Sequence, residues 1–271
     1  MISHAHTISP SLSKYVAAMI YNKDYYPECE MDKYLPDGTI NIIFELTGTD
    51  KFIFDNNTKK KKQGYSDVWF SGVLKDYITI SAASEEMIVV VFKPGSGFPL
   101  IHKSVNLYTN KVVQANEIFG TSILELHTQL KAPTSPQEKF NAIEKWLLPQ
   151  FKEDDFYTNI IHFAIDTIQN SSSKISIANL AKKTGFSQKQ FIQLFKKYVG
   201  ITPKQFHRII RFNEILAALE NKEKISWTAI SADCGYFDQA HFIKDFQSFS
   251  GLNPKKYLSD VGDYPNYVPV K

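Results

Sequence analysis

The sequence predicts an α+β protein in which a β-rich N-terminal domain precedes an all-α C-terminal domain. Short runs of β-branched and aromatic residues, separated by turn residues, fill the chain up to about residue 107. Apolar residues then recur at helical spacing as far as residue 258. The last third of the chain contains one helical unit twice. A length of 271 residues also favours two domains.

Five runs between residues 39 and 92 have the composition of β-strands. The first follows Pro36-Asp37-Gly38, which is a strong turn signal. Short strands at this spacing favour a β-sandwich or barrel over alternating βαβ units. Residues 12–22 fit a short helix and an early strand equally well. The five predicted strands are 39–46, 51–54, 67–70, 77–80 and 87–92.

Two segments of this half have features of ligand sites, but a structural interpretation fits each of them better. Lys59–Lys62 lies between turn residues, so a solvated hairpin tip is favoured over a contact with nucleic acid. Residues 93–100 lack both the Gly-Lys-Ser/Thr of a phosphate-binding loop and the three spaced glycines of a dinucleotide fingerprint. Pro99 also removes a backbone donor. We expect this segment to be a turn that closes the sheet.

Helical periodicity begins after residue 107. The three helices expected before the duplicated unit span 117–130, 137–151 and 156–169. Pro149 and the acidic residues 153–155 mark a linker. The predicted organisation is 1–152 as a β-rich domain with C-terminal helices, 153–260 as a helical domain and 261–271 as a tail.

The formal net charge of +3 conceals an uneven distribution. Residues 174–258 carry 14 Lys and Arg against 6 Asp and Glu, whereas the rest of the chain carries 17 against 22. A basic domain attached to an acidic one is typical of a nucleic-acid binder with a non-binding partner domain.

Several protein classes do not fit this sequence. Cys29 and Cys234 are too few for a disulfide framework or a four-thiolate zinc site, and they fit a reduced compartment. The first ten residues lack the basic and apolar segments of a signal peptide. Apolar runs stay well short of the ~18 residues of a membrane span. The sequence therefore predicts a cytoplasmic protein with no membrane partner.

The duplicated unit is visible as matching residues at a nearly constant offset. Gly185 and Gly235 lie 50 residues apart, and the matching residues that follow them lie 51 apart. A short helix, a glycine–aromatic turn and a longer helix ending in Gly-x-x-Pro form the layout of a helix-turn-helix. The matching pairs are Phe191 and Phe242, Phe195 and Phe246, Gly200 and Gly251, and Pro203 and Pro254.

The longer helix of each unit is its predicted recognition helix. Ser187 is predicted to cap the first, over 188–199, and Asp238 the second, over 239–249. A connecting helix over 203–219 begins with a proline, which suits the first turn of a helix.

Polar residues on the outward faces of these helices are the candidate DNA contacts. Glutamine can bond to adenine and lysine to guanine in the major groove, which makes such residues on the recognition helices candidates for base contacts. Basic residues further along, and those on the connecting helix, are candidates for phosphate contacts. The base candidates are Gln188, Lys189, Gln190, Gln193, Gln239, His241 and Lys244. The phosphate candidates are Lys196, Lys197, Lys204, Arg208 and Arg211, of which the last two are the chain's only arginines.

For two parts of this assignment, an alternative is that the residues do not contact DNA. His241 fits an ordinary surface histidine as well as a DNA contact. The basic residues of the connecting helix also fit an amphipathic connector whose charges are merely solvated.

Six motifs between residues 177 and 258 occur together in one known family. They are Gly185-Phe186-Ser187, Phe191-x-x-x-Phe195-Lys196-Lys197, Gly200-Ile201-Thr202-Pro203, Gly235-Tyr236, Phe242-x-x-x-Phe246 and Gly251-Leu252-Asn253-Pro254. On these motifs, the stretch Ile177–Leu258 resembles the DNA-binding domain of AraC/XylS-type transcription regulators. The resemblance implies seven helices in two helix-turn-helix subdomains, with the recognition helices in successive major grooves.

The same resemblance assigns base-facing positions to Lys189, Gln193, Gln239 and Lys244. This chain departs from the family in having no arginine on either recognition helix. It also has Phe237 where a small polar residue is usual. Both departures leave open which bases are contacted.

In the N-terminal half, residues 36–44 and 92–100 resemble the sensor domain of a subgroup of uncharacterised AraC-like regulators. This resemblance implies a β-rich, cupin-like domain that senses a ligand or pairs two copies of the chain.

The expected function is that of a sequence-specific, DNA-binding transcription regulator that is not an enzyme. Double-stranded DNA is the expected partner, and a small-molecule effector, RNA polymerase and a second copy of the chain are candidate partners. Activation is the expected sign, although no residue distinguishes it from repression. No catalytic residue, metal ligand or cofactor is predicted.

Two alternatives remain open at this stage. A cupin-like sheet could hold a metal, which would make the chain an enzyme or metal-binding protein with a DNA-targeting domain. Against this, His102 lies near the end of the strand region without a second histidine at ligand spacing. The N-terminal domain could instead be a dimerisation module without a ligand, with its aromatic residues as plain core.

Overall fold

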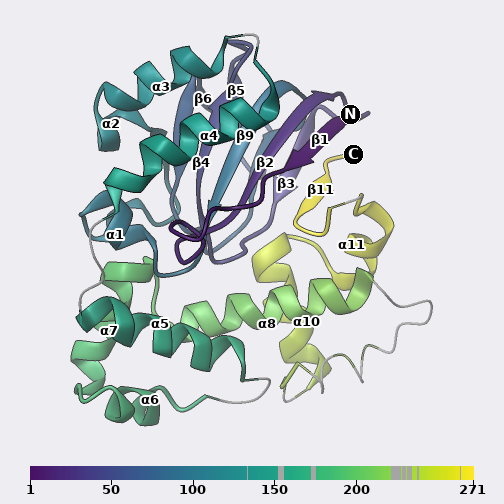
Figure 1. The fold of residues 1–271 in the computed structure, drawn as a ribbon. Helices are drawn as coiled ribbons and strands as arrows, with labels where there is room; N and C mark the ends of the chain where they lie inside the picture. The colour runs from purple at the N-terminus through teal and green to yellow at the C-terminus, as the bar shows by residue number, and fades with distance from the viewer. Residues whose placement is uncertain are drawn as a thin grey trace.

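The computed structural model of the chain (Figure 1) describes residues 1–132, 134–151, 156–171, 175–220, 227, 230, 234–236, 238–262 and 264–271. A β domain with its own covering helices lies at the top of the view, and a helical module lies beneath it. The predicted α+β class is therefore confirmed.

Within these residues, the β domain contains two antiparallel sheets. The order of the six-stranded sheet is β1 (Ile2–Ala5), β2 (Val16–Tyr25), β9 (Ser84–Phe92), β4 (Ile40–Glu45), β7 (Val68–Ser71) and β10 (Val112–Gln114). The order of the five-stranded sheet is β11 (Tyr267–Pro269), β3 (Met31–Tyr34), β8 (Ile78–Ser81), β5 (Lys51–Phe54) and β6 (Lys61–Tyr65). Every residue of β4 is buried, which explains its mainly apolar sequence.

The five predicted strands are all present with ends within a few residues of those expected. Of residues 12–22, for which helix and strand were both left open, 16–22 form the first part of β2 and 12–15 form the turn before it. The lysine run belongs to the hairpin of β5 and β6, as predicted, because Lys59 and Lys60 lie in its turn. Lys61 and Lys62 begin β6, an exposed edge strand whose charges discourage pairing with another sheet.

The segment 93–100 is more than the turn that the sequence predicted. It contains the start of a short helix, α1 (Gly97–Ile101), which is followed by a 3-10 helix, η1 (Val105–Tyr108). Gly97 lies so close to Val105 that a Cβ on it would stand 2.7 Å from a methyl group of that valine. Close packing, rather than phosphate binding, explains the glycine.

Helices cover the six-stranded sheet (Figure 1). The single helix predicted over 117–130 is in fact two, because Gly120 ends the first in a positive-φ conformation. Phe119 packs edge-on against Phe70 of β7, and Phe140 stacks on His6 beside β1. The helices of this part are α2 (Asn116–Phe119), α3 (Ser122–Leu130), α4 (Pro136–Leu147) and the short η2 (Leu148–Gln150).

The helical module begins with α5 (Phe156–Gln169), at the predicted bounds. Its further helices within the described residues are α6 (Ile177–Lys183), α7 (Gln188–Val199), α8 (Pro203–Glu220), α10 (Gln239–Ser250) and α11 (Pro254–Asp260). The linker residues 153–155 and the turn residues 231–233 lie outside the described part of the chain.

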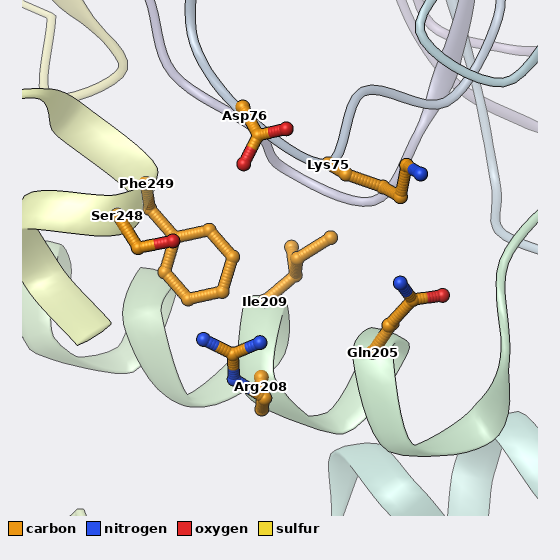
Figure 2. A pocket seen from close by; sticks show the side chains of 7 residues that line it. All are labelled: Lys75, Asp76, Gln205, Arg208, Ile209, Ser248 and Phe249. Carbon is orange, nitrogen blue, oxygen red and sulfur yellow. The ribbon is translucent and has the colours of Figure 1, made fainter.

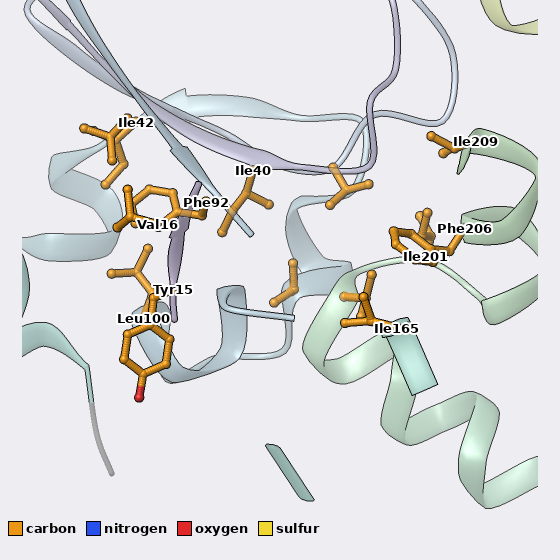
Figure 3. Close-up of a cluster of buried hydrophobic side chains, with 14 of the residues drawn as sticks. Tyr15, Val16, Ile40, Ile42, Phe92, Leu100, Ile165, Ile201, Phe206 and Ile209 are labelled. Atoms are coloured by element: carbon orange, nitrogen blue, oxygen red, sulfur yellow. The ribbon is translucent and has the colours of Figure 1, made fainter. Parts of the chain in front are cut away.

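One apolar core continues from the β domain into the helical module. Figure 3 shows Ile40 and Phe92 of the sheet at one end of this cluster and Ile165 of α5 and Phe206 of α8 at the other. Phe206 is fully buried, and its ring lies against the Cα of Gly38 in the turn before β4. The two domains are therefore packed together without an intervening polar layer.

The C-terminal residues return to the β domain. Residues 261–271 were predicted as a tail, but Tyr267–Pro269 form β11, which pairs with β3. Val268 of this strand is fully buried, and the Leu35 amide donates to the Asn266 carbonyl at 2.8 Å. The helical module is thus attached to the β domain at both of its ends.

None of the helices in the described ranges has the length and apolar content that crossing a membrane requires.

Shortening Val268 tests whether β11 is an integral part of the fold. Val268→Ala removes two buried methyl groups, so we expect the free energy of unfolding to fall by about 2 kcal/mol. Urea denaturation followed by circular dichroism measures it. Val270→Ala, at a less buried position of the same segment, is the matched control and should cost clearly less. Equal costs at both positions would contradict the integral role of β11.

Candidate nucleic-acid interface

The first helix-turn-helix unit consists of α6 and α7. Ser187 and Gln190 form a reciprocal cap at the start of α7, in which each side chain accepts a hydrogen bond from the other's backbone amide. The cap fixes the start of the recognition helix at the predicted residue. It also occupies the side-chain oxygen of Gln190, which leaves that candidate base contact only its amide group.

The polar face of α7 is directed away from the core. Its apolar residues, Phe191, Phe195 and Tyr198, recur at helical spacing and are buried. The candidates Gln188, Lys189 and Gln193 are exposed, whereas Ile192 and Leu194 are half-buried. Lys196 is half-buried.

Lys197 differs from the other basic residues of α7. Its ammonium group lies 4.1 Å from the ring centroid of Phe98, a residue of α1 in the β domain. A phosphate contact by Lys197 would therefore compete with this attachment to the β domain.

The second recognition helix is α10, whose described length exceeds the predicted range by one residue. Asp238 caps it by accepting a hydrogen bond from the His241 amide at 2.7 Å. The candidates Gln239, His241 and Lys244 are all exposed. The His241 ring lies edge-on to Tyr236, and its Nε2 stands 4.0 Å from the Asp245 carboxylate.

The turn ahead of α10 is described only in part. Cys234, Gly235 and Tyr236 are described, whereas Phe237 and residues 231–233 lie outside the described residues. Trp227 stacks on Phe242 with ring centroids 6.0 Å apart, and Ile230 is buried. These contacts bury the apolar side of α10.

The connecting helix α8 holds the two units together, and this changes the assignment of both arginines. Arg208 makes a bidentate pair with Asp245 of α10, through hydrogen bonds of 2.8 and 3.3 Å. Its guanidinium also lies over the ring of Phe249. Asp245 itself is buried, although it lies on a helix most of whose other polar residues are exposed.

Arg211 was predicted to contact phosphate, and the structure gives it a different role. Only 8% of its surface is exposed. Its Nε donates to the Cys234 carbonyl at 2.8 Å, and its guanidinium stacks on the Tyr236 ring at 3.7 Å. Arg211 thus fastens the second unit to α8 and is not retained as a DNA contact. On the same helix, the candidate Lys204 is exposed.

Burial perturbs two side chains that surround Arg211. Burial and, secondarily, the positive charge of Arg211 lower the pKa of His207 below its usual range. Burial raises the pKa of Tyr236 well above that of a free tyrosine. Both residues are therefore neutral at neutral pH, which limits the charge that is buried beside the guanidinium.

A small pocket lies where the β domain meets α8 and α10 (Figure 2). Lys75 and Asp76 project into it from the loop before β8, opposite Arg208 of α8 and Phe249 of α10. Its volume is about 130 Å³, well below the roughly 300–1,000 Å³ typical of sites for drug-sized ligands. A molecule held here would therefore be small and polar.

Histidines and carboxylates do not gather into a metal site in the described part of the chain, where groups of three or more His, Cys, Asp and Glu residues at suitable positions are absent. His102, the histidine considered as a ligand, ends α1 and is exposed.

Two family models match separate parts of the chain. Residues 180–260 match a helix-turn-helix domain, and residues 4–114 match a domain of unknown function (DUF6597). The first match covers both α7 and α10, and the second covers the strands of the β domain up to β10.

The sequence relatives match only part of the chain. An uncharacterised HTH-type transcriptional regulator of Haemophilus influenzae is 30% identical over 121 residues, which cover 45% of this chain and 39% of the relative. The XylDLEGF operon transcriptional activator 3 of Pseudomonas putida is 29% identical over 104 residues, covering 38% and 30% of the two chains. This chain thus spans two fifths or less of the length of these relatives.

Among solved structures, a variant of ToxT from Vibrio cholerae aligns over 89% of this chain and 97% of its own length. The TM-score is 0.47 and the sequence identity is 10%.

The Arg208–Asp245 pair is open to a double-mutant cycle. Removing either partner by Arg208→Met or Asp245→Asn should lower the free energy of unfolding, and the double variant should lose less than the sum. We expect a coupling of about 1–2 kcal/mol, because the hydrogen bonds are charge-assisted but Arg208 is partly exposed. Chemical denaturation measures all four proteins. Additive losses would show that the pair contributes nothing.

The buried His207 makes the stability depend on pH. Since its pKa is lowered in the folded state, the unfolded chain binds more protons below about pH 6.5. The free energy of unfolding should therefore fall as the pH is lowered from 7.5 to 5.5, and His207→Gln should reduce this slope. Burial raises the pKa of Asp32 to about 6, which opposes the trend in part.

The comparison of variant with wild type isolates the contribution of His207, because Asp32 is present in both. The exposed His102→Gln serves as the control and should leave the slope unchanged. A slope unaffected by His207→Gln would contradict this account.

Proposed function

We propose that the protein is a sequence-specific transcription regulator of the AraC/XylS type, on the premise that residues 180–260 match a helix-turn-helix domain. The observation that carries the proposal is that both recognition helices bury their apolar side and expose a polar, basic side at their N-terminal ends. Such a face suits base contacts in the major groove.

The two recognition helices would enter successive major grooves on one face of a duplex. Gln188, Lys189 and Gln193 would contact bases in one groove, with Gln239, His241 and Lys244 in the other. Lys196 and Lys204 would contact phosphate, and Lys197 would join them on release from Phe98. The two half-contacts of one chain would lie about 10 base pairs apart.

The β domain would control whether the helical module binds DNA. Its apolar core is continuous with that of α5 and α8 (Figure 3), so a ligand that favours one arrangement of the β domain would shift the population of binding-competent molecules. We propose a small-molecule effector, with the pocket beside Arg208 as one place for a small polar one.

Activation is the proposed sign of regulation, by analogy with the Pseudomonas putida relative named as an activator. RNA polymerase and a second copy of the chain are proposed partners on the same basis. The cytoplasm, where DNA and reduced cysteines are found, is the proposed location. The regulators that the chain resembles offer no support for an enzymatic role.

Selection from a random duplex library tests the proposal directly. The wild-type protein should enrich a bipartite sequence whose two parts lie about one helical turn apart. Gln193→Ala should lose discrimination at one base pair, by about 1–3 kcal/mol, while Lys204→Ala should weaken binding to all sequences and reduce the salt dependence. Lys103→Ala, an exposed lysine of the β domain, is the control. Retention of DNA without any enriched sequence would contradict a specific regulator.

A further inference from the structure

Each recognition helix ends on a glycine that lies against the β domain. Gly200 ends α7 with φ +96°, and Gly251 ends α10 with φ +66°. A Cβ on Gly200 would stand 3.1 Å from Val105, and one on Gly251 would stand 2.5 Å from the Tyr77 ring. The positive φ angles are therefore not the only reason for glycine at these positions. The absence of a Cβ also lets the β domain approach both helix ends closely.

Hydrogen bonds from the β domain reach the same two helix ends. The Thr109 hydroxyl donates to the Gly200 carbonyl at 2.6 Å, and the Lys33 ammonium donates to the Ser250 carbonyl at 3.3 Å. Carbonyls at a helix C-terminus lack partners within the helix, so each bond satisfies a group that the helix leaves free. Lys33 also lies over the Tyr77 ring, 4.5 Å from its centroid.

Between the two helices, α8 is the connection within the module. Phe206 of α8 contacts Phe195 of α7, and Phe212 of α8 contacts Phe246 and Phe249 of α10. These contacts hold each unit to α8. Because they all lie along this one helix, other contacts are needed to stop the units from rotating about the axis of α8. The β domain supplies such contacts at a second place, the C-terminal ends of both recognition helices.

We propose that the β domain clamps both recognition helices at their C-terminal ends and thereby fixes their separation and relative rotation. Val105 and Thr109 form one jaw, and Lys33 and Tyr77 form the other; all four are positioning residues and do not touch DNA. The use that we assign to the clamp, which is to set the spacing of the two DNA half-sites, rests on the proposed function.

The two jaws belong to different parts of the β domain. Lys33 lies in β3 of the five-stranded sheet and Tyr77 precedes β8 of the same sheet, whereas Thr109 lies between η1 and β10 of the six-stranded sheet. A shift of one sheet against the other would therefore move the recognition helices relative to each other. The clamp is pre-organised, which spares the ordering cost on binding DNA.

The test removes both polar anchors and keeps side-chain volume. Lys33→Met combined with Thr109→Val is the clamp variant, and Thr109→Val alone is the milder one. Lys62→Met combined with Thr128→Val is the matched control, because Lys62 is exposed and the Thr128 hydroxyl bonds to a helix carbonyl of α3, away from the module.

The first readout needs no DNA. Spin labels on Gln193→Cys and Gln247→Cys, both at exposed positions in a Cys29→Ser background, report the distance between the recognition helices. We expect a narrow distribution in the wild type and the control and a broader one in the clamp variant, with an intermediate width for Thr109→Val. Equal widths in all four proteins, each with cooperative thermal unfolding, would overturn the proposal.

The second readout is spacing preference on the enriched bipartite duplex. The ratio of affinities for the native spacing and for a spacing one base pair longer should fall by about tenfold in the clamp variant, as expected for two hydrogen bonds of ordinary strength. Affinity for each half-site alone should stay unchanged. A preserved ratio, or an equal loss on single half-sites, would refute a role in spacing. Absence of any enriched duplex for the wild type would count against the proposed function, while the spin-label distances would still decide the clamp.

Discussion

The structure depends on the simultaneous burial of one helix, α8, against three neighbours. Phe206 meets the first helix-turn-helix unit and the turn before β4, and Phe212 meets the second unit. Arg208 and Arg211 complete the attachment of the second unit. Because these contacts use the chain's only two arginines, lysine and glutamine are left for the surface. The exposed face of the module therefore carries lysine but lacks the bidentate groups that arginine would supply.

Local sequence patterns predicted the elements whose stabilising contacts are local. The bounds of α5 and α7 follow from apolar residues at helical spacing, and the start of α7 follows from the Ser187 cap. What the sequence could not predict depends on contacts between distant residues. The three residues of β11 form a strand because they pair with β3, more than 230 positions away, and the short α1 forms under η1 and α5. Neither has a periodic pattern of its own.

The same distinction applies to the candidate interface. The exposed positions of Lys189, Gln193, Gln239 and Lys244 followed from the positions of their apolar neighbours, and each is exposed in the structure. Helical spacing predicts the direction of a side chain but not which residues of other segments contact it. Arg211 was therefore misassigned, since Cys234 and Tyr236 face it from 23 and more residues away. A carboxylate on a recognition helix, Asp245, was the one available signal that a nearby arginine had an internal partner.

Strand β11 has a consequence for the order of events during synthesis. The β3 edge that it covers is translated within the first 34 residues, whereas its partner strand follows the whole helical module. At translation rates of about 5–20 residues per second, that edge would wait on the order of ten to fifty seconds for its neighbour. During that interval an unpaired strand edge is open to other chains. The β domain can thus complete its second sheet only after the helix-turn-helix units have emerged from the ribosome, which couples the maturation of one domain to the presence of the other.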